Sequence, residues 1–339
     1  MSAHSMAPAM DYTRCTVIGG AGMLGFEMVK QLLAAGKQVT VLDLHPLPEP
    51  LCDGRVGDIR DRAAVRAACE GSEVVFQTAA AVWEPGTPAG IYETVNVEGN
   101  RIVIDACRGL GIRRLVYTST IDVVCDGRKP IVDGDESLPY PAETPDDHYS
   151  RTKIEAEKMM MAANGPDLAT CALRPAGMYG PRDRYHLGNI VDMARRGKYM
   201  RVGSGKARFT HVYSENAAHV HLLAADRLFP GSPVAGQIYF VGDHYPATNL
   251  FDFMEPYLEG LGLPVPKRSI PYPVAYAAAC VAELVAPKSN LTRFSVAQTC
   301  VDHTYRHDKA ERDLGYSPIV SFEEAFRRTL AYWKEHSIE

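Results

Sequence analysis

The sequence lacks several features that would assign it to a specialised class of protein. No Lys- or Arg-rich run occurs in its 339 residues, and 36 basic side chains face 41 acidic ones, which gives a net charge of −5. A nucleic-acid partner is therefore not expected, because the phosphate backbone requires a basic surface. The eight cysteines contain no C-x-x-C pair, which argues against a zinc site or a disulfide framework and favours a reducing compartment.

Neither a signal peptide nor a membrane-spanning segment is expected. Residues 1–10 have no basic and no apolar region, and we interpret them as a disordered tail. The longest apolar stretch, 274–286, is too short to cross a bilayer. We interpret it as a buried or substrate-facing helix, with a peripheral membrane contact as the alternative. These absences predict a soluble, cytoplasmic, enzyme-sized protein.

The first half of the chain alternates β-branched runs with helical patterns, which predicts an α/β fold with a doubly wound parallel sheet of the Rossmann type. Beyond Arg174, glycine and proline become frequent, although 237–241 still has the pattern of a strand. We therefore predict a smaller, interleaved C-terminal substrate-binding region. The expected strands are 14–18, 38–43, 74–78, 115–119, 171–174 and 237–241, and the expected helices are 23–35, 62–69, 91–110, 148–163, 214–227 and 322–336. The predicted division is a cofactor-binding domain at 11–175 that also receives 209–243, a substrate-binding region at 176–208 and 244–320, and a C-terminal helix at 321–339.

A glycine-rich loop lies between the first strand and the first helix. Gly19 would allow the tight turn, Gly22 the approach of a pyrophosphate to the backbone, and Gly25 close packing of helix on strand. Asp43 ends the second strand, where an acidic residue can bind the adenosine ribose. No Arg follows Asp43 to meet a 2′-phosphate, so the loop predicts NAD rather than NADP.

Asp58 follows the third strand position. Its carboxylate could accept a hydrogen bond from the adenine amino group, or it could cap the helical segment 60–69. The pattern alone leaves both interpretations open.

Tyr149 and Lys153 are four residues apart on a predicted helix, so their side chains project from one face. A tyrosine that carries a proton needs a lowered pKa, and a nearby ammonium favours the phenolate. Thr120 ends the fifth strand, at the carboxyl edge where ligands bind in open α/β sheets. Its hydroxyl could hold a substrate oxygen beside Tyr149, or it could cap a turn.

With these residues, the sequence resembles the extended short-chain dehydrogenase/reductase family over nearly its whole length, and within that family the 3β-hydroxysteroid dehydrogenase group. The resemblance is carried by the glycine loop, by Tyr149 and Lys153, and by 117–120, which is similar to the family's Y-T-S-S strand end. Four further segments, 58–59, 96–100, 174–181 and 209–224, are similar to family motifs. Ile18 stands where the family has Thr, and Thr120 where it has Ser; Ser119, next to it, is the other candidate for the third hydroxyl.

The resemblance implies roles for particular residues. Tyr149 would be the base, Lys153 would lower the pKa of Tyr149 and hold the nicotinamide ribose, and Thr120 would orient the substrate oxygen. Hydride passes directly to the nicotinamide, so no metal is expected. The resemblance also implies a homodimer formed through helices 91–110 and 148–163. The predicted cofactor-binding residues are Gly19, Gly22, Met23, Leu24, Gly25, Asp43, Asp58, Ile59, Ala79, Ala80, Asn96, Thr118, Tyr149, Lys153, Pro175 and Met178.

The implied activity is NAD-dependent oxidation of a secondary alcohol, the 3β-hydroxyl of a sterol or steroid, followed by loss of carbon dioxide if the substrate carries a 4-carboxyl group. The alternative enzyme is a nucleotide-sugar epimerase or dehydratase, whose diphosphate could be bound by arginines at 182, 184, 195, 196 and 201. A non-catalytic NAD-binding sensor is the alternative outside enzymes. It is disfavoured because Tyr149 and Lys153 are both present.

Two other sets of residues suggest chemistry that we do not expect. His219 and His221 are two apart and fall on different faces of a helix, which argues against a metal site. Cys125 follows the catalytic strand, and we interpret it as a small core residue rather than a nucleophile.

Overall fold

The computed structural model describes residues 11–84, 86–142, 147–285 and 291–336. Its centre is a seven-stranded parallel sheet in the order β12-β7-β5-β4-β1-β2-β3. The predicted doubly wound α/β fold is confirmed. The strands are β1 (Arg14–Ile18), β2 (Gln38–Asp43), β3 (Asp53–Val56), β4 (Val74–Gln77), β5 (Arg114–Thr118), β7 (Ala169–Pro175) and β12 (Ile238–Val241).

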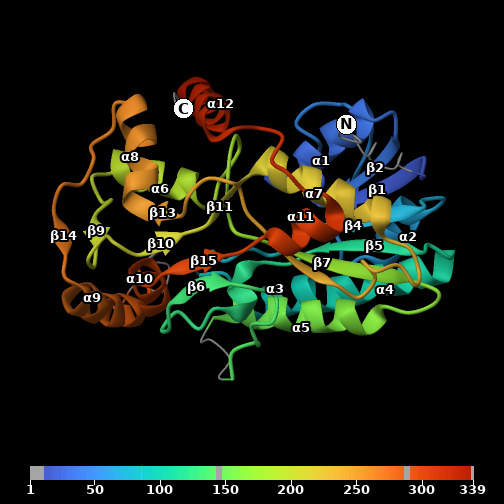
Figure 1. Cartoon of the computed structure of the whole chain (residues 1–339), viewed down its shortest axis with the longest axis horizontal. Helices are drawn as coiled ribbons and strands as arrows, with labels where there is room; N and C mark the ends of the chain where they lie inside the picture. Colours follow the sequence, from blue (N-terminus) through green and yellow to red (C-terminus); the bar gives the residue numbers. More distant parts are fainter. Residues whose placement is uncertain (1–10, 85, 143–146, 286–290, 337–339) are drawn as a thin grey trace, which may run out of the picture.

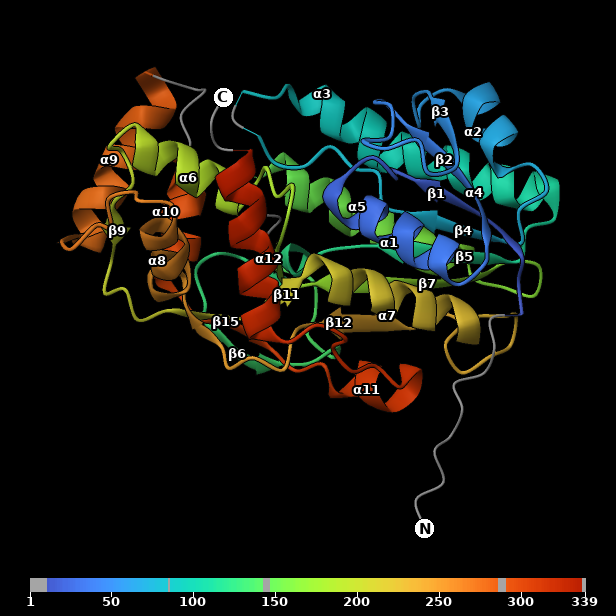
Figure 2. The same cartoon turned by 90° about the horizontal axis from the view of Figure 1, so that it is seen from above.

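Helices cover both faces of this sheet (Figures 1 and 2). The strands alternate their side chains between two apolar cores, because successive residues of a strand point to opposite faces. Val17 and Val116 belong to the first core, and Ile18 and Leu115 to the second. The first core is covered by α1 (Met23–Ala34), α7 (Ser214–Arg227) and α11 (Asp308–Leu314), and the second by α2 (Arg62–Cys69), α4 (Gly99–Leu110) and α5 (His148–Ala163).

The helix expected at 91–110 is interrupted by a π-helical segment. It consists of α3 (Ala89–Tyr92), the π-helical η1 (Glu93–Glu98) and α4. Asn96 lies in η1, and its buried amide bonds to Ala81 and Thr152. We interpret the π-helical segment as the adjustment that turns Asn96 toward these partners, since such segments are frequent at functional sites.

A second group of elements lies at one end of the sheet (Figure 1). Its helices α6 (Leu187–Arg195), α8 (Leu250–Gly260) and α12 (Phe322–Glu335) share an apolar core, and α9 (Tyr272–Val285) packs against α10 (Arg293–Cys300). The C-terminal helix is therefore part of this core. Its small sheets contain β6 (Ile131–Gly134), β8 (Gly177–Tyr179), β9 (Arg201–Val202), β10 (Arg208–Phe209), β11 (His211–Tyr213), β13 (Thr248–Asn249), β14 (Ser269–Ile270) and β15 (His303–Tyr305).

The interleaving of the two regions goes further than the sequence indicates. Strand β6 lies within the range 11–175 expected for the cofactor-binding domain, yet it pairs with β15 near the C-terminus. The chain therefore leaves the central sheet after β5 and returns to it at β7. The exact domain division stays a prediction.

Candidate active site

The candidate site lies where β1, β4 and β5 end, at the carboxyl edge of the sheet. The sheet order reverses between β1 and β4, since β2 and β3 lie on one side and the remaining strands on the other. Ligands of open α/β sheets bind at this switch point. The glycine loop, the segment 78–84 and Thr120 all follow these strand ends.

The glycine loop makes contacts that only glycine permits. Gly19 has a φ of +90°, and a Cβ on it would lie 2.6 Å from the nitrogen of Ala79. A Cβ on Gly25 would lie 2.1 Å from the oxygen of Gly19. These two glycines therefore allow β1, the segment after β4 and α1 to approach one another, as the sequence predicts.

The N-terminus of α1 fits an anionic pyrophosphate. Gly22 is its N-cap and supplies no side-chain cap, and the first turn holds no acidic residue. The first N–H groups of a helix, here including those of Met23 and Leu24, have no acceptor within the helix and carry the positive end of its dipole. The backbone can therefore hold the phosphates of a dinucleotide without any side chain.

Asp43 is held beside this loop. Its carboxylate accepts hydrogen bonds from the backbone nitrogens of Ala21 at 2.9 Å and His45 at 3.0 Å. It ends β2 next to β1, the place at which a ribose-binding acid is expected. Its contact with ribose stays a prediction.

The suggestion that Asp58 caps the following helix is wrong. The N-cap of α2 is Asp61, whose side chain accepts from the nitrogens of Ala63 and Ala64. Asp58 instead forms an ion pair with Arg60 at 2.5 Å. The alternative contact of Asp58 with adenine stays a prediction, and Ile59 beside it is buried.

Asn96 binds the backbone of the segment that follows β4. Its Oδ1 accepts from the nitrogen of Ala81 at 2.8 Å, and its Nδ2 donates to the oxygen of Ala81 at 3.1 Å and to Thr152 Oγ1 at 3.1 Å. We therefore interpret Asn96 as positioning the segment that contains Ala79 and Ala80, rather than as a direct cofactor contact.

Lys153 and Tyr149 project from the start of α5, whose N-cap Asp147 accepts from the nitrogens of Tyr149 and Ser150. Lys153 is 3% exposed, and its Nζ donates to the carbonyl oxygen of Thr118 at 2.7 Å. Burial lowers the pKa of Lys153 to about 7, although Glu157 and Asp122 oppose this. The lysine is thus fixed against the end of β5.

The expectation that the pKa of Tyr149 is lowered is wrong for the protein on its own. Burial raises the pKa of the Tyr149 phenol, and the carboxylate of Asp122 raises it further. A hydrogen bond with the Thr120 hydroxyl opposes this rise. The expected lowering rests on Lys153 alone and does not include the carboxylate of Asp122.

Of the two candidate hydroxyls, Thr120 is the one connected to Tyr149. Thr120 Oγ1 donates to Asp122 Oδ2 at 2.9 Å and accepts from the nitrogen of Asp122 at 3.2 Å. Ser119 is buried, and its hydroxyl has no hydrogen-bond partner among the described residues. The geometry therefore favours Thr120, which also caps the short 3-10 helix η2 (Ile121–Val124).

Thr118 is bound from the other face of the sheet. Its Oγ1 lies 2.9 Å from Nε2 of His221, and Nδ1 of that ring lies 2.7 Å from the oxygen of Ala217. Both ring nitrogens of His221 are thus used within the fold. Pro175 ends β7 and Met178 lies in the short strand β8, on the segment that follows.

Three residues near the site, Asp122, Gln298 and Arg182, make contacts that the sequence does not predict. Asp122 is only two positions beyond Thr120, a spacing that could have drawn attention to it. Gln298 of α10 donates to Asp122 Oδ1 at 3.1 Å. Arg182 donates to the carbonyl oxygen of Ala21 at 2.9 Å. No sequence signal connects Gln298 or Arg182 with partners so far away in the chain.

Most of the arginines suggested for a sugar diphosphate have other partners. Arg182 donates to the carbonyl oxygen of Ala21 in the glycine loop. Arg196 pairs with Asp192 at 2.8 Å, and Arg201 pairs with Asp252 at 3.0 Å. Arg184 is exposed.

Cys125 is a core residue, as expected. It is fully buried, and its Sγ lies 3.4 Å from Nδ1 of His303. Burial raises the pKa of the Cys125 thiol to about 12 and lowers that of His303 to about 4. The pair therefore stays neutral, and Cys125 is a poor nucleophile.

The apolar stretch 274–286 forms most of α9, and the expectation that it is buried is wrong for its outer face. Ala275 and Ala279 are buried, whereas Leu284 is 84% and Val285 75% exposed. Ala286 lies outside the described residues. Among the described helices, none combines the length and apolar character that crossing a membrane requires.

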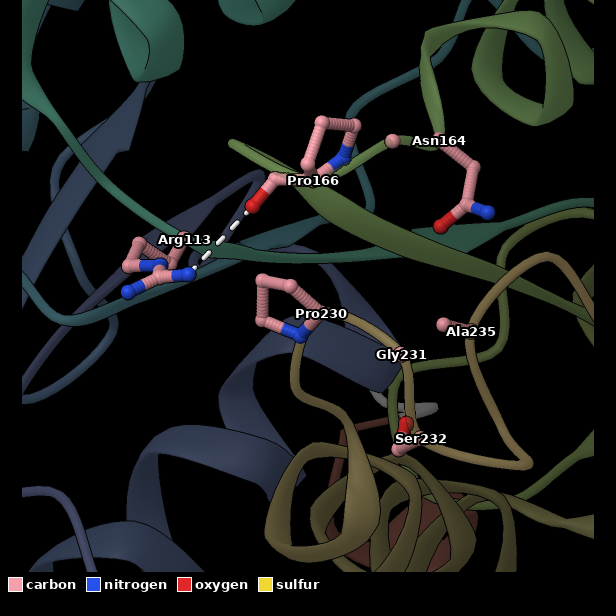
Figure 3. A pocket seen from close by; sticks show the side chains of 8 residues that line it. Arg113, Asn164, Pro166, Pro230, Gly231, Ser232 and Ala235 are labelled. Carbon is pink, nitrogen blue, oxygen red and sulfur yellow. Dashed lines mark hydrogen bonds between the residues drawn. The ribbon is translucent and has the colours of Figure 1, made fainter.

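Two further features lie away from the site. A hollow of about 520 Å³ lies between the turns that precede β7 and β12, and Arg113 and Asn164 line it (Figure 3). It is at the amino edge of the sheet, opposite Thr120. His244, His307 and Glu311 offer ligand atoms within 4.8 Å of one another, a grouping that the sequence did not suggest. Nε2 of His244 lies 2.9 Å from Oε1 of Glu311, a hydrogen-bond distance.

Comparison with known proteins gives consistent similarities. Residues 16–273 match the 3-beta hydroxysteroid dehydrogenase/isomerase family. A sterol-4-alpha-carboxylate 3-dehydrogenase, decarboxylating, of Mus musculus is 35% identical over 94% of this chain and 90% of its own. A 2-alkyl-3-oxoalkanoate reductase of Stenotrophomonas maltophilia is 36% identical over 93% and 98%. A 3beta-hydroxysteroid-dehydrogenase/decarboxylase of Arabidopsis thaliana is 36% identical over 96% of this chain, which spans 63% of that relative.

Solved structures share the fold at lower identity. The epimerase Mth375 of Methanothermobacter thermautotrophicus has a TM-score of 0.77 and 21% identity, with 97% of this chain and 94% of that one covered. The UDP-glucose 4-epimerase of Thermus thermophilus, solved with NAD, has a TM-score of 0.73 and 22% identity, with 96% and 100% covered. At these identities the likeness concerns the fold alone.

Proposed function

Because the chain belongs to the 3-beta hydroxysteroid dehydrogenase/isomerase family, we propose that it oxidises the 3β-hydroxyl group of a sterol or steroid. At the coarser level, it is an NAD-dependent oxidoreductase that acts on CH–OH groups. The observation that carries the proposal is that Thr120, Tyr149 and Lys153 come together at the end of β5, where Lys153 Nζ donates to the carbonyl oxygen of Thr118 at 2.7 Å. A substrate hydroxyl bound beside Thr120 and Tyr149 would meet the hydroxyl groups of both side chains.

The residues divide the reaction between them. Bound NAD supplies the hydride acceptor at the nicotinamide C4. Thr120 and Tyr149 hold the substrate oxygen, and Tyr149 receives the proton of the O–H bond as the C–H bond breaks. Lys153 is held against the end of β5 by its hydrogen bond to Thr118 and would bind the nicotinamide ribose. Gly19, Gly22, Gly25 and Asp43 would position the adenosine and pyrophosphate.

A carboxyl group next to the new ketone would extend the reaction. The product of oxidising a 4-carboxysterol at C3 is a β-keto acid, which loses carbon dioxide readily. The relative from Mus musculus is named as decarboxylating, and the relative from Stenotrophomonas maltophilia as acting on a 2-alkyl-3-oxoalkanoate, which is also a β-keto acid. Both names support an apolar substrate that carries a hydroxyl or ketone group on the carbon next to the one that bears the carboxyl group.

Two partner proposals accompany this function. A family-like homodimer would use the outer surfaces of α4 and α5, which pack side by side. The exposed Val281, Leu284 and Val285 of α9 would touch a membrane from which an apolar substrate is collected. We expect the protein to co-sediment with liposomes and Val281→Asp/Leu284→Asp to abolish this. Val132→Asp, at an exposed valine on β6, is the control, and the membrane contact is rejected if wild type stays in the supernatant.

The substrate class is tested by incubating the purified protein with NAD and a panel of alcohols. The panel contains a 3β-hydroxysterol, its 4-carboxylate, a 2-alkyl-3-hydroxyalkanoate, UDP-glucose and a simple secondary alcohol. We expect NADH formation with the sterols, abolished in Tyr149→Phe. NADH or epimer formed only from UDP-glucose would replace the proposal with the nucleotide-sugar alternative. Turnover of the alkanoate alone would move the substrate class to open-chain β-hydroxy acids.

A further inference from the structure

Asp122 is an acid placed next to the hydroxyl groups that hold the substrate oxygen. It lies on η2, directly after the strand that ends in Thr118. Its Oδ2 accepts the proton of Thr120 Oγ1 at 2.9 Å, and its Oδ1 accepts from Gln298 Nε2 at 3.1 Å. Asp122 is half-buried. Asp122 has no role in the proposed function as the residues above divide it.

The direction of these hydrogen bonds is informative. A threonine hydroxyl has one proton, and here that proton points to Asp122. With that proton directed to Asp122, the oxygen of Thr120 has a lone pair that could take a proton from the neighbouring Tyr149 phenol. Burial and the Asp122 carboxylate raise the pKa of Tyr149, so its phenol stays protonated and cannot take a further proton unless it passes its own proton on.

We propose that Tyr149, Thr120 and Asp122 form a proton relay in which Asp122 is the final acceptor during alcohol oxidation. The inference rests on the proposed function, in which Tyr149 receives the hydroxyl proton of the substrate. As the hydride leaves the carbinol carbon, the alcohol O–H bond breaks and an O–H bond forms on Tyr149. The phenolic proton moves to Thr120 Oγ1, and the proton of Thr120 moves to Asp122 Oδ2. The alcohol becomes a ketone, NAD becomes NADH, and Asp122 becomes a carboxylic acid.

The surroundings of Asp122 raise its affinity for a proton above that of an ordinary aspartate. Burial raises the pKa of Asp122, and Asp147 at the start of α5 raises it further. Hydrogen bonds from Thr120 and Gln298 and the ammonium of Lys153 oppose this rise. Tyr149 on α5, Cys125 after η2 and Tyr305 on β15 are the other titratable groups that feel its charge. Asp122 acts through Thr120, so it is a positioning residue and does not touch substrate.

The first test is the pH profile of alcohol oxidation by the NAD-bound enzyme, with whichever alcohol of the panel is turned over. In wild type the rate should fall on the acid side as Asp122 becomes protonated and reach a plateau above that. Asp122→Asn should lower the plateau rate by about 10- to 100-fold, because the charged proton acceptor is lost. The rate of this variant should no longer reach a plateau and should instead keep rising to alkaline pH. Asp126→Asn, at a neighbouring acid that caps a turn, should keep the wild-type profile.

Two further variants separate a relay from a structural role. Gln298→Leu removes a hydrogen bond that lowers the pKa of Asp122, so the acid limb should move to higher pH by about half to one unit. Thr120→Val breaks the relay in the middle, so adding Asp122→Asn to it should cause little further loss. A proton inventory in mixtures of light and heavy water should curve in wild type and become linear in Asp122→Asn. An unchanged acid limb in Asp122→Asn would overturn the relay.

A readout without turnover keeps this inference separate from the substrate proposal. The ultraviolet absorbance of phenolate, taken as the difference between the NAD-bound enzyme and its Tyr149→Phe variant, reports the titration of Tyr149. Asp122→Asn should move this titration to lower pH, because a negative charge next to the phenol is removed. If no alcohol of the panel is oxidised, the proposed function fails. The titration then decides alone: a shift supports the coupling of Asp122 to Tyr149, and an unchanged titration overturns it.

Discussion

The guanidinium of Arg182 donates to the carbonyl oxygen of Ala21 over 2.9 Å, which joins the segment after β8 to the glycine loop. Arg182 has a φ of +68°, a backbone conformation that side chains other than glycine rarely adopt. It also packs over the ring of Phe26 in α1, 5.0 Å from the ring centroid. A residue held in an unfavourable conformation with its charge beside the phosphate-binding helix suggests a role in binding the cofactor.

Arg182→Ala should therefore weaken NAD. The cation lies next to the first turn of α1, and its loss should raise the dissociation constant by about tenfold, the value of one hydrogen bond to a charged group. Arg184→Ala, at the exposed arginine two residues on, is the matched control. Fluorescence titration with NAD measures both variants, and equal affinities for the two would show that Arg182 serves the fold only.

Asp43 determines the choice of cofactor in our interpretation. Its carboxylate should accept hydrogen bonds from the adenosine ribose and repel a 2′-phosphate. Asp43→Ala should weaken NAD by about 1–3 kcal/mol and improve the relative use of NADP. Asp53→Ala on the neighbouring edge strand should change neither affinity. Dissociation constants for both dinucleotides check the expectation, which fails if the NAD-to-NADP preference of Asp43→Ala equals that of wild type.

Tyr149 and Thr120 should separate chemistry from cofactor binding. Tyr149→Phe removes the proton carrier and should reduce turnover by about 10²–10⁴ while NAD affinity stays near that of wild type. Thr120→Ser keeps the hydroxyl and should retain most activity, whereas Thr120→Val should retain little. Lys153→Ala should damage both turnover and NAD affinity.

Steady-state rates and NAD titrations with these variants test the assignment, and Ser119→Ala is the matched control. Near-normal turnover in Tyr149→Phe would reject the mechanism. A large loss in Ser119→Ala together with full activity in Thr120→Val would transfer the role of Thr120 to Ser119.

The parts of the site that could be predicted from sequence are those set by local geometry. The spacing of Gly19, Gly22 and Gly25 between a strand and a helix follows from backbone approach alone, and the i, i+4 spacing of Tyr149 and Lys153 follows from helix geometry. The parallel sheet was predictable for the same reason, because alternating apolar strands and amphipathic helices are local patterns.

The remaining features depend on contacts between distant parts of the chain. Gln298 reaches Asp122 across 176 residues and Arg182 reaches Ala21 across 161, and no periodicity encodes either contact. The direction of the Tyr149 pKa shift does not follow from the spacing to Lys153, because it depends on burial and on Asp122, which are both products of the tertiary fold. The outer face of α9 was expected to be buried because its composition alone does not show which residues find a partner.

The contact between Thr118 and His221 predicts how stability depends on pH. Burial lowers the pKa of His221 from its ordinary value of 6.5 to about 4. As pH falls below 6.5, the unfolded chain binds a proton at this histidine and the folded chain does not, so folding is progressively disfavoured until pH 4. At pH 5 this amounts to about 2 kcal/mol relative to pH 7.5.

His221→Gln can keep a donor to Ala217 and an acceptor for Thr118 but cannot be protonated. Urea unfolding should therefore show wild type losing about 2 kcal/mol relative to His221→Gln between pH 7.5 and 5. Parallel stability curves for wild type and His221→Gln would show that His221 does not resist protonation in the fold.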